Sequence, residues 1–251
     1  MVLIINFCLK NLANQQGSSI FLVNMRFSCG QILPFLICLG AETSEAHSIA
    51  WSDALGENDL TSYGALINSS YHFELGTFGS FTPDNSNLAT WRTNWKRLDT
   101  GVYNDAIQYF SGEATQNWNA TDSVWNPDAS DAPASTSTQF AEGEQVYIWI
   151  YNNLDQVAGT EWGVFTRTGT GAWKLPDFAG GGQPDLTQTM VISQANTTPF
   201  GGLPTGQGPG YFAPPTTGFA YQTHNFAPVP EAGSFLLAGF ALVGGLLRRR
   251  R

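Results

Sequence analysis

The residue types that could carry out acid–base chemistry are few and scattered. The chain has three histidines, His47, His72 and His224, which leaves few candidates for a catalytic triad or a three-histidine metal site. Glu142 and Glu144 alternate along an extended segment and would face the same way, as the paired acids of a glycosidase must. Acidic residues are common in this region, so such a pair arises easily by chance. We therefore expect no catalytic residues and no enzymatic activity.

Two acidic loops could offer oxygen ligands to Ca²⁺. Neither has the regular Asp-x-Asp-x-Asn-Gly spacing with a distal Glu that defines a dedicated calcium loop. We expect both loops to be solvated, with no bound metal and no cofactor. Their candidate ligands are Asp84, Asn85 and Asn87 in the first loop, and Asp128, Ser130 and Asp131 in the second.

All eight tryptophans lie between His47 and Asn196. Flat aromatic rings can stack on the C–H faces of sugars, but burial in the core is the default for most of these positions. Trp118 and Trp125 lie in a polar stretch and are the pair least explained by packing. They are the candidate glycan contacts of this sequence.

Composition and charge narrow the class of protein. Only 12% of the residues are charged, and 27 glycines and 13 prolines are present, which is typical of a loop-rich β protein. Between His47 and Ala227 there are five basic and seventeen acidic residues, a net charge of −12. Nucleic-acid binding needs clustered Lys and Arg, so the charge excludes that partner.

The cysteines are confined to the N-terminal part of the chain. Cys8, Cys29 and Cys38 are followed by 213 residues without a thiol. A cysteine-bound zinc site and an internal disulfide are therefore excluded beyond residue 38, and the fold must rest on packing alone.

The region from His47 to about Asn196 reads as a series of short strands. From Gln145 to Tyr151, apolar residues occupy both alternating faces, which predicts a central strand buried on both sides. Further strands are predicted at 71–75, 162–166 and 187–193, separated by Gly- and Asn-rich turns.

One segment has helical spacing. Leu88, Trp91, Trp95 and Leu98 lie three, four and three residues apart, which predicts an amphipathic helix with Gly101 beyond its end. The fold class predicted is therefore mainly β, with a single β-sandwich-like domain over residues 47–195 and one short amphipathic helix.

Residues 1–46 are interpreted as an N-terminal signal segment. The stretch before Met25 lacks the positive charge that precedes the apolar core of a leader, whereas Met25 is followed by Arg26 and an apolar stretch. Met25 is therefore the preferred start. Small residues at Ser44 and Ala46 predict cleavage after Ala46. The alternative is a short buried helix or strand broken by Pro34.

Residues 196–228 change in composition. Twelve of these thirty-three residues are Gly or Pro and none is charged, which predicts a flexible or polyproline-like spacer. The alternative is an irregular last strand packed by aromatic residues, namely Phe200, Tyr211, Phe212, Phe219 and Tyr221.

The C-terminal residues 229–251 have three parts in a fixed order. Val229, Pro230, Glu231 and Ala232 are followed by fifteen uncharged residues (233–247). Four arginines then end the sequence, namely Arg248, Arg249, Arg250 and Arg251.

This order resembles the PEP-CTERM sorting signal of exopolysaccharide-producing bacteria, with Ala232 at the position of the usual second proline. The resemblance covers about 23 residues and leaves the body unassigned. It implies an exosortase-like membrane transpeptidase as a partner, acting near the Val-Pro-Glu-Ala motif, and a C-terminal transmembrane helix.

We therefore expect an exported, non-catalytic protein of the cell surface or extracellular matrix. The C-terminal helix would hold it in the cell envelope at least transiently, with the arginines on the cytoplasmic side. The alternative is an exopolysaccharide-binding module or a glycan-processing enzyme.

Overall fold

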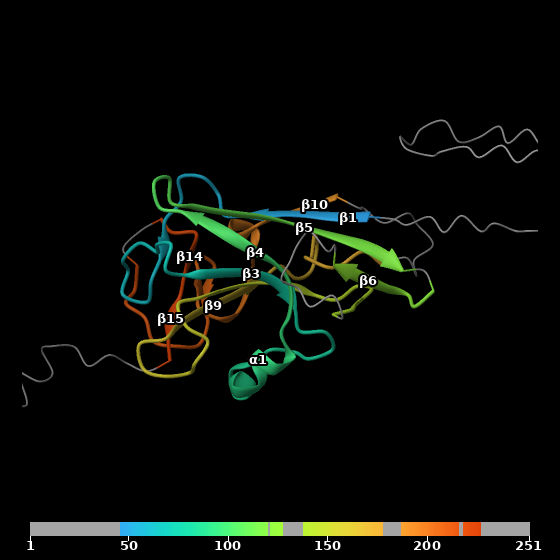
Figure 1. Ribbon diagram of the computed structural model, residues 1–251. Coiled ribbons are helices and arrows are strands. Elements are labelled where there is room, and N and C mark those ends of the chain that lie inside the picture. Colours follow the sequence, from blue (N-terminus) through green and yellow to red (C-terminus); the bar gives the residue numbers. More distant parts are fainter. Residues whose placement is uncertain (1–45, 120, 128–137, 178–186, 216–217, 227–251) are drawn as a thin grey trace, which may run out of the picture. The chain divides into compact units, whose positions relative to one another are not determined.

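The computed structural model describes residues 46–119, 121–127, 138–177, 187–215 and 218–226 (Figure 1). Within these ranges the chain is mainly β, and its single α-helix is the four-residue α1 (Trp91–Asn94). Two 3₁₀ turns are present at Asn85–Thr90 and Ile192–Gln194. The predicted β class is confirmed.

Fifteen strands occur in the described residues. They are β1 (Ala46–Ser52), β2 (Asp59–Leu60), β3 (His72–Thr77), β4 (Lys96–Asn104), β5 (Tyr109–Asn119), β6 (Val124–Pro127), β7 (Phe140–Ala141), β8 (Val146–Tyr151), β9 (Glu161–Thr166), β10 (Thr187–Val191), β11 (Thr197–Phe200), β12 (Gly202–Leu203), β13 (Gly206–Gln207), β14 (Tyr221–Gln222) and β15 (His224–Asn225).

Within the described ranges, these strands form two sheets. The larger has eleven strands, with the main order β10-β1-β5-β4-β3-β8-β9-β11, and the smaller has the order β13-β12-β14-β2. Most neighbours are antiparallel, while β1 pairs with β10 and β2 pairs with β14 in parallel. In Figure 1, β1, β5 and β10 lie on one side of β3 and β9, and α1 lies on the other side.

Strand β8 is central, as its sequence predicted. It pairs with β3 on one side and β9 on the other, and all six of its residues are buried. Its alternate side chains enter two separate apolar clusters. Val146, Ile148 and Ile150 join the main core, while Tyr147, Trp149 and Tyr151 join a second core.

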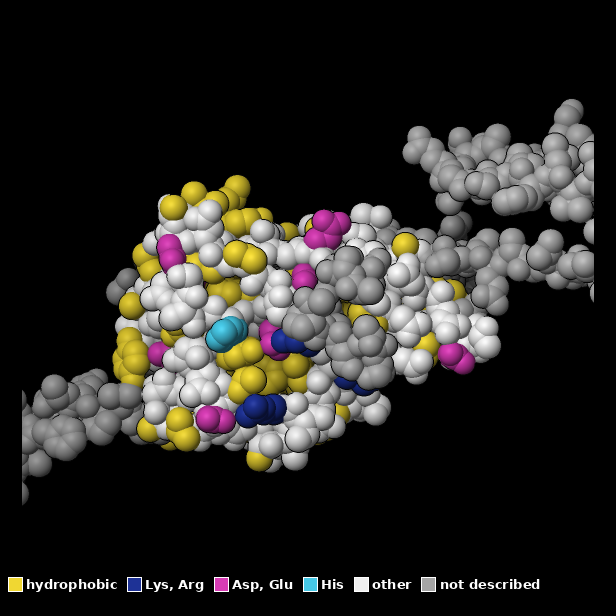
Figure 2. Space-filling view, in the orientation of Figure 1, with side chains coloured by type: hydrophobic (Ala, Val, Ile, Leu, Met, Phe, Trp, Pro, Cys, Tyr) yellow, Lys and Arg dark blue, Asp and Glu magenta, His cyan; other side chains and the backbone are white. Residues whose placement is uncertain are grey.

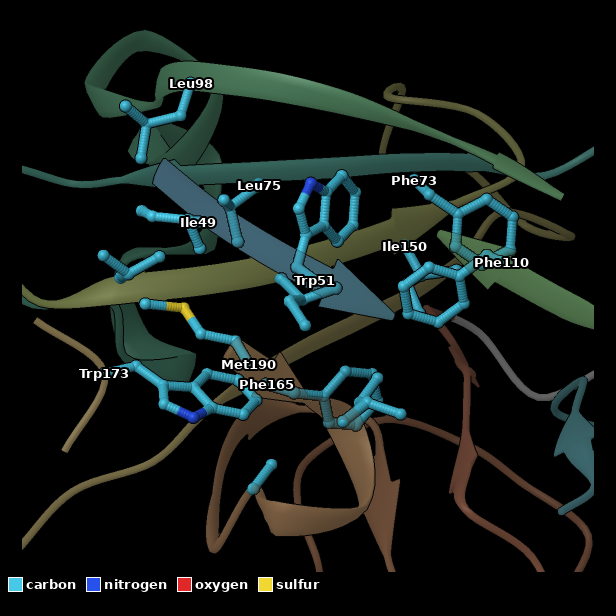
Figure 3. Packing of buried hydrophobic residues seen from close by; sticks show 14 of the residues in the cluster. Ile49, Trp51, Phe73, Leu75, Leu98, Phe110, Ile150, Phe165, Trp173 and Met190 are labelled. Carbon is cyan, nitrogen blue, oxygen red and sulfur yellow. The ribbon is translucent and has the colours of Figure 1, made fainter. Parts of the chain in front are cut away.

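The main core contains side chains from both sheets. Figure 3 shows residues from β1, β3, β5 and β8 packing together with Phe165 of β9 and Met190 of β10. The Trp51 indole lies against Gly101 and Gly112, where an added Cβ would overlap the ring. Its Nε1 donates to Asp99 Oδ2 at 2.6 Å. These two glycines are therefore required for packing, because only their hydrogen atoms leave room for the indole.

The second core lies on the opposite face of β8 and β9 and is almost wholly aromatic. It is covered by the segment around α1, from which Trp91 is fully buried and Leu88 and Trp95 are partly buried. The buried members are Phe78, Trp91, Tyr147, Trp149, Tyr151, Trp162, Val164 and Phe200.

The amphipathic helix is shorter than predicted. It ends at Asn94, Trp95 is extended (ψ 126°), and Leu98 lies in strand β4. The apolar stripe from Leu88 to Leu98 therefore serves two different cores, since Trp91 and Trp95 enter the second core and Leu98 enters the main core. A three-four-three spacing cannot distinguish one continuous helix from a helix followed by a strand.

The spacer prediction for residues 196–228 is wrong over 197–225, where the chain forms five strands. Phe200, Tyr221 and His224 are buried. The His224 ring stacks on Phe212 with centroids 4.2 Å apart, and its Nδ1 lies 2.7 Å from the Pro209 carbonyl. Phe200 and Tyr221 supply packing as the alternative expected, although Tyr211 is 52% exposed and the segment forms several short strands rather than one.

None of the helices in the described ranges has the length and apolar character needed to cross a bilayer. Residues 1–45 of the predicted signal segment and the whole of 229–251 lie outside the described residues. Ala46, after which cleavage is predicted, is the first residue of β1.

Candidate functional site

A pocket of about 330 Å³ opens beside the second core, where the start of β3, the end of β8 and α1 come together. Figure 2 shows this face, on which apolar side chains lie between basic, acidic and histidine side chains. The pocket is lined by His72, Arg92, Tyr151, Asn152, Asn153, Leu154 and Asp155.

An aromatic pair forms one wall of the pocket. His72 and Tyr151 lie opposite each other in the β3–β8 register, and their rings stack with centroids 5.2 Å apart at 26°. Tyr151 is buried while His72 is exposed. The imidazole therefore has one face on the tyrosine and is accessible to solvent.

Glu74 holds the Tyr151 side chain in place through a hydrogen bond to its hydroxyl. The Tyr151 hydroxyl donates to Glu74 Oε1 at 2.8 Å. Glu74 also accepts from Trp95 Nε1 at 2.7 Å and pairs with Arg97 at 3.2 Å. Burial, together with the nearby Glu74 charge, raises the pKa of Tyr151 above its usual value of 10. Tyr151 is therefore a protonated, fixed hydrogen-bond donor at neutral pH.

A charged pair forms another part of the wall. Arg92 of α1 and Asp155 of the β8–β9 loop approach to 3.5 Å, with side chains 63% and 66% exposed. The loop is held in place by Gln156, whose Nε2 donates to the Leu88 carbonyl at 2.7 Å. An exposed ion pair at this separation is weak, so both groups can form hydrogen bonds with a ligand.

The predicted glycan contacts do not lie in this pocket. Trp118 and Trp125 are directly opposite in the β5–β6 register, with rings 5.2 Å apart. Trp125 is fully buried in the main core and its Nε1 donates to the Pro176 carbonyl at 3.1 Å. It therefore offers no face to a sugar, and that prediction is wrong for Trp125. Trp118 is partly buried against the same core.

The two acids proposed as a same-face pair, Glu142 and Glu144, do not lie together on one strand. Glu142 lies in the turn after β7, and Glu144 follows Gly143, whose φ of +67° turns the chain. Glu144 accepts from Thr77, from Lys96 Nζ at 3.1 Å and from the Ala141 amide at 2.9 Å. The two carboxylates are thus not consecutive same-face groups of one strand, because a turn lies between them.

The first acidic loop contributes a helix cap. Asp84 accepts from the Ser86 amide at 2.7 Å, and Asn87 accepts from the Asp84 amide at 2.9 Å. The hydrogen bonds from Ser86 to the carboxylate lower the pKa of Asp84. Asp128, Ser130 and Asp131 lie outside the described residues. Across the described residues, no three His, Cys, Asp or Glu side chains converge as a metal site would require.

Comparison with known families assigns the C-terminus. Residues 228–251 match the PEP-CTERM protein-sorting motif. The match covers the Val-Pro-Glu-Ala motif, the apolar segment and the four arginines, so the predicted resemblance is confirmed. No curated protein and no solved structure matched the chain. The sorting motif supports export through exosortase-type processing.

Besides Glu74, sequence reasoning missed three buried acids among the described residues. Glu161 is 4% exposed and accepts hydrogen bonds only from neutral groups: the Ser62 amide (3.0 Å), Ser62 Oγ (2.6 Å), the Tyr71 hydroxyl (2.7 Å) and Thr223 Oγ (2.7 Å). Asp53 and Asp59 are also buried. The available signal was the position of Glu161 at the start of an apolar strand, since a buried acid there must find donors.

Proposed function

We propose that this protein is an exported, non-catalytic component of the cell surface or extracellular matrix, sorted through its C-terminal signal. The observation that carries the proposal is the sorting motif at 228–251. An exosortase-like membrane transpeptidase is the partner that this motif implies. The body is a β-sandwich-like domain that the tail holds at the membrane until processing.

The physical properties of the tail support this topology. Fifteen helical residues extend about 22 Å, which is shorter than the roughly 30 Å hydrocarbon core. Long arginine side chains can reach the interface and make up part of the difference. Positive charge beside an apolar span is retained on the cytoplasmic side, so Arg248 to Arg251 would leave the body outside.

A non-catalytic role is supported by the way the body uses its acids. Glu74, Glu144 and Glu161 each accept several hydrogen bonds from neighbouring structural groups. A general acid or base needs a carboxyl group that can reach substrate. These three groups are instead engaged in holding strands and loops together.

Mass spectrometry of the protein from its native envelope tests the sorting proposal, because it defines both mature ends. We expect the mature chain to begin at His47 and to lack Arg248 to Arg251. Replacing Pro230 and Glu231 with alanine should give uncut precursor in the membrane fraction, since both residues lie outside the apolar span. Wild-type protein that keeps its arginines in mature cells would contradict sorting cleavage and leave a plain membrane anchor.

A second candidate function is binding of exopolysaccharide, and the pocket is the observation that favours it. Arg92 can donate to one sugar hydroxyl while Asp155 accepts from its neighbour, and the exposed His72 ring can pack on the sugar C–H face. The body carries a net charge of −12, so we expect a neutral polysaccharide to be preferred over an acidic one.

Affinity electrophoresis with dextran and with alginate would test this binding. We expect retardation by the neutral polymer, reduced by His72→Ala and by Asp155→Asn. Trp118→Ala is the control, because Trp118 lies on β5 away from the pocket lining. Loss of binding in Trp118→Ala alone would instead place the site at the β5–β6 hairpin. Absence of retardation in wild type with either polymer would contradict this candidate function.

A further inference from the structure

Two buried aspartates flank the loop between the first two strands. Asp53 directly follows β1 and Asp59 begins β2. They are 2% and 0% exposed. Asp59 is aligned with Tyr221 in the parallel pairing of β2 with β14. The pair therefore lies where the first strands of the body meet the segment that precedes the sorting motif.

Among the described residues, no positive charge compensates this pair. The groups that face it are Glu57 from the same loop, Tyr103 from β4 and Tyr221 from β14. Taken as ionised, the two aspartates find no hydrogen-bond donor among the described residues at normal distance and angle. The Tyr103 hydroxyl is likewise buried with no hydrogen-bond partner in that part of the chain. The Tyr221 hydroxyl lies beside Asp59 and the Phe110 backbone lies beside Asp53, but neither meets that distance and angle.

Two adjacent carboxylates cannot both remain charged in such a place. Removing each from water is costly, and the second negative charge adds repulsion. A proton on one group removes one charge and lets that carboxyl donate to the other. We propose that Asp53 and Asp59 share one proton in the folded protein and form a pH-dependent lock that holds β14 against β2.

The pKa values of both aspartates are raised, as the burial of two neighbouring carboxyl groups requires. Burial, followed by the neighbouring carboxyl group, raises the pKa of Asp59 from 3.8 to about 9. Burial also raises the pKa of Asp53, to about 6. Because the folded values lie above the unfolded value of 3.8, folding takes up protons and stability is lost as pH rises. Between pH 7 and 8.5 one shared proton remains in the folded pair.

The backbone contacts around the lock show what deprotonation would loosen. The Thr223 amide donates to the Leu60 carbonyl at 2.8 Å, and the Ala220 amide donates to the Asn58 carbonyl at 2.8 Å. Both bonds join the β14 segment to the loop and strand that contain Asp59. A second negative charge beneath them would weaken this docking, so the last strands would separate from the body before the large sheet opens.

Denaturant unfolding of the full chain between pH 7 and 8.5 tests the proposal. This window also avoids His224, whose pKa burial lowers to about 4, so that it is neutral in the folded and largely neutral in the unfolded chain. One shared proton predicts that the folding equilibrium constant of wild type falls about tenfold per pH unit. Asp59→Asn should remove this slope, since its amide donates to Asp53 without a titrating proton.

Two further variants complete the experiment. Asp122→Asn is the matched control, because Asp122 is exposed, and it should keep the wild-type slope. Asp53→Asn repeats the test from the other side of the pair if Asp59→Asn does not fold. Hydrogen exchange should protect the Ala220 and Thr223 amides more strongly in Asp59→Asn than in wild type at pH 8.5.

Two results would overturn the proposal. Equal slopes in wild type and both pair variants would show that no proton is shared. A melting temperature raised by Ca²⁺ and lowered by chelator, with the effect absent in Asp59→Asn, would show that a cation rather than a proton holds the two carboxylates together.

Discussion

Trp149 provides the sharpest test of the core of the body. Its indole is fully buried on the central strand β8. The rings of Trp162 and Trp95 lie 4.8 and 5.2 Å from it, centroid to centroid, and Phe78 lies 6.0 Å away. We expect Trp149→Ala to destabilise the fold without affecting any binding surface.

The expected loss of stability in Trp149→Ala follows from two opposing effects. Burial of an aromatic side chain removes about 200 Å² from water, which at about 25 cal/mol per Å² corresponds to about 5 kcal/mol. The Trp149 Nε1, however, has no acceptor among the described residues. Truncation therefore also removes a desolvation cost of about 1–2 kcal/mol. The expected loss in the free energy of unfolding is about 3–4 kcal/mol.

Trp162→Ala is the matched comparison. Trp162 is buried in the same cluster, but its Nε1 donates to the Asn153 carbonyl at 2.7 Å. Its truncation removes a hydrogen bond and relieves no desolvation cost, so Trp162→Ala should cost at least about 1 kcal/mol more than Trp149→Ala.

Urea unfolding of the full chain, followed by far-UV circular dichroism, would measure both losses. His72→Ala serves as a control, because His72 is exposed on the neighbouring strand, and should change stability by less than about 1 kcal/mol. A loss below about 1 kcal/mol for Trp149→Ala would refute the central position of β8. A larger loss for Trp149 than for Trp162 would refute the hydrogen-bond argument.

Three further predictions concern other parts of the chain. Glu161→Gln should lower the free energy of unfolding by at least about 2 kcal/mol, because an amide cannot accept from all four donors; equal stability in chemical denaturation would show that the donors find other partners. Gly112→Ala should lower the melting temperature by several degrees, since the added methyl group overlaps the Trp51 indole; calorimetry that finds no change would mean that the indole moves freely. Neutral residues at Arg248 to Arg251 should misdirect the protein, and unchanged membrane fractionation would show that these charges do not orient the tail.

The central strand and the sorting motif could be predicted because their signals are local. Apolar residues on both alternating faces of 145–151 require cover on both sides, and β8 has it. The tail has three parts whose order along the chain is itself the signal. Neither inference depends on which distant residues the chain brings together.

The segment 197–225 shows why composition misled. A high content of Gly and Pro does not show at which positions of the segment these residues form turns. Gly201 and Gly210 have φ of +103° and +104°, a backbone conformation that glycine adopts readily. Phe200 and Tyr221 supply the buried surface. Glycines that allow tight turns between large aromatic residues build a compact segment, whereas the same glycines among polar residues would not.

The buried acids could not be predicted for a different reason. Asp53 and Asp59 flank a Leu-Gly-Glu-Asn sequence that is typical of an exposed turn, and nothing local distinguishes a solvated carboxylate from a buried one. Tyr103 and Tyr221, which lie close to the two aspartates in the fold, are distant from them in sequence. The pattern of apolar residues therefore identifies which segments must be buried. It does not identify which distant segments pack against a given carboxyl group, and those segments determine whether that group is protonated.

The predicted leader-cleavage site lies within a strand of the folded body. Ala46 and His47 lie within β1, which pairs with both β5 and β10, and His47 is fully buried near Trp125. A peptidase needs an accessible extended chain, so the predicted cleavage after Ala46 would have to precede the pairing of β1. At the other end, β15 finishes at Asn225, before the matched motif begins at 228. The predicted leader removal therefore belongs before β1 joins the sheet.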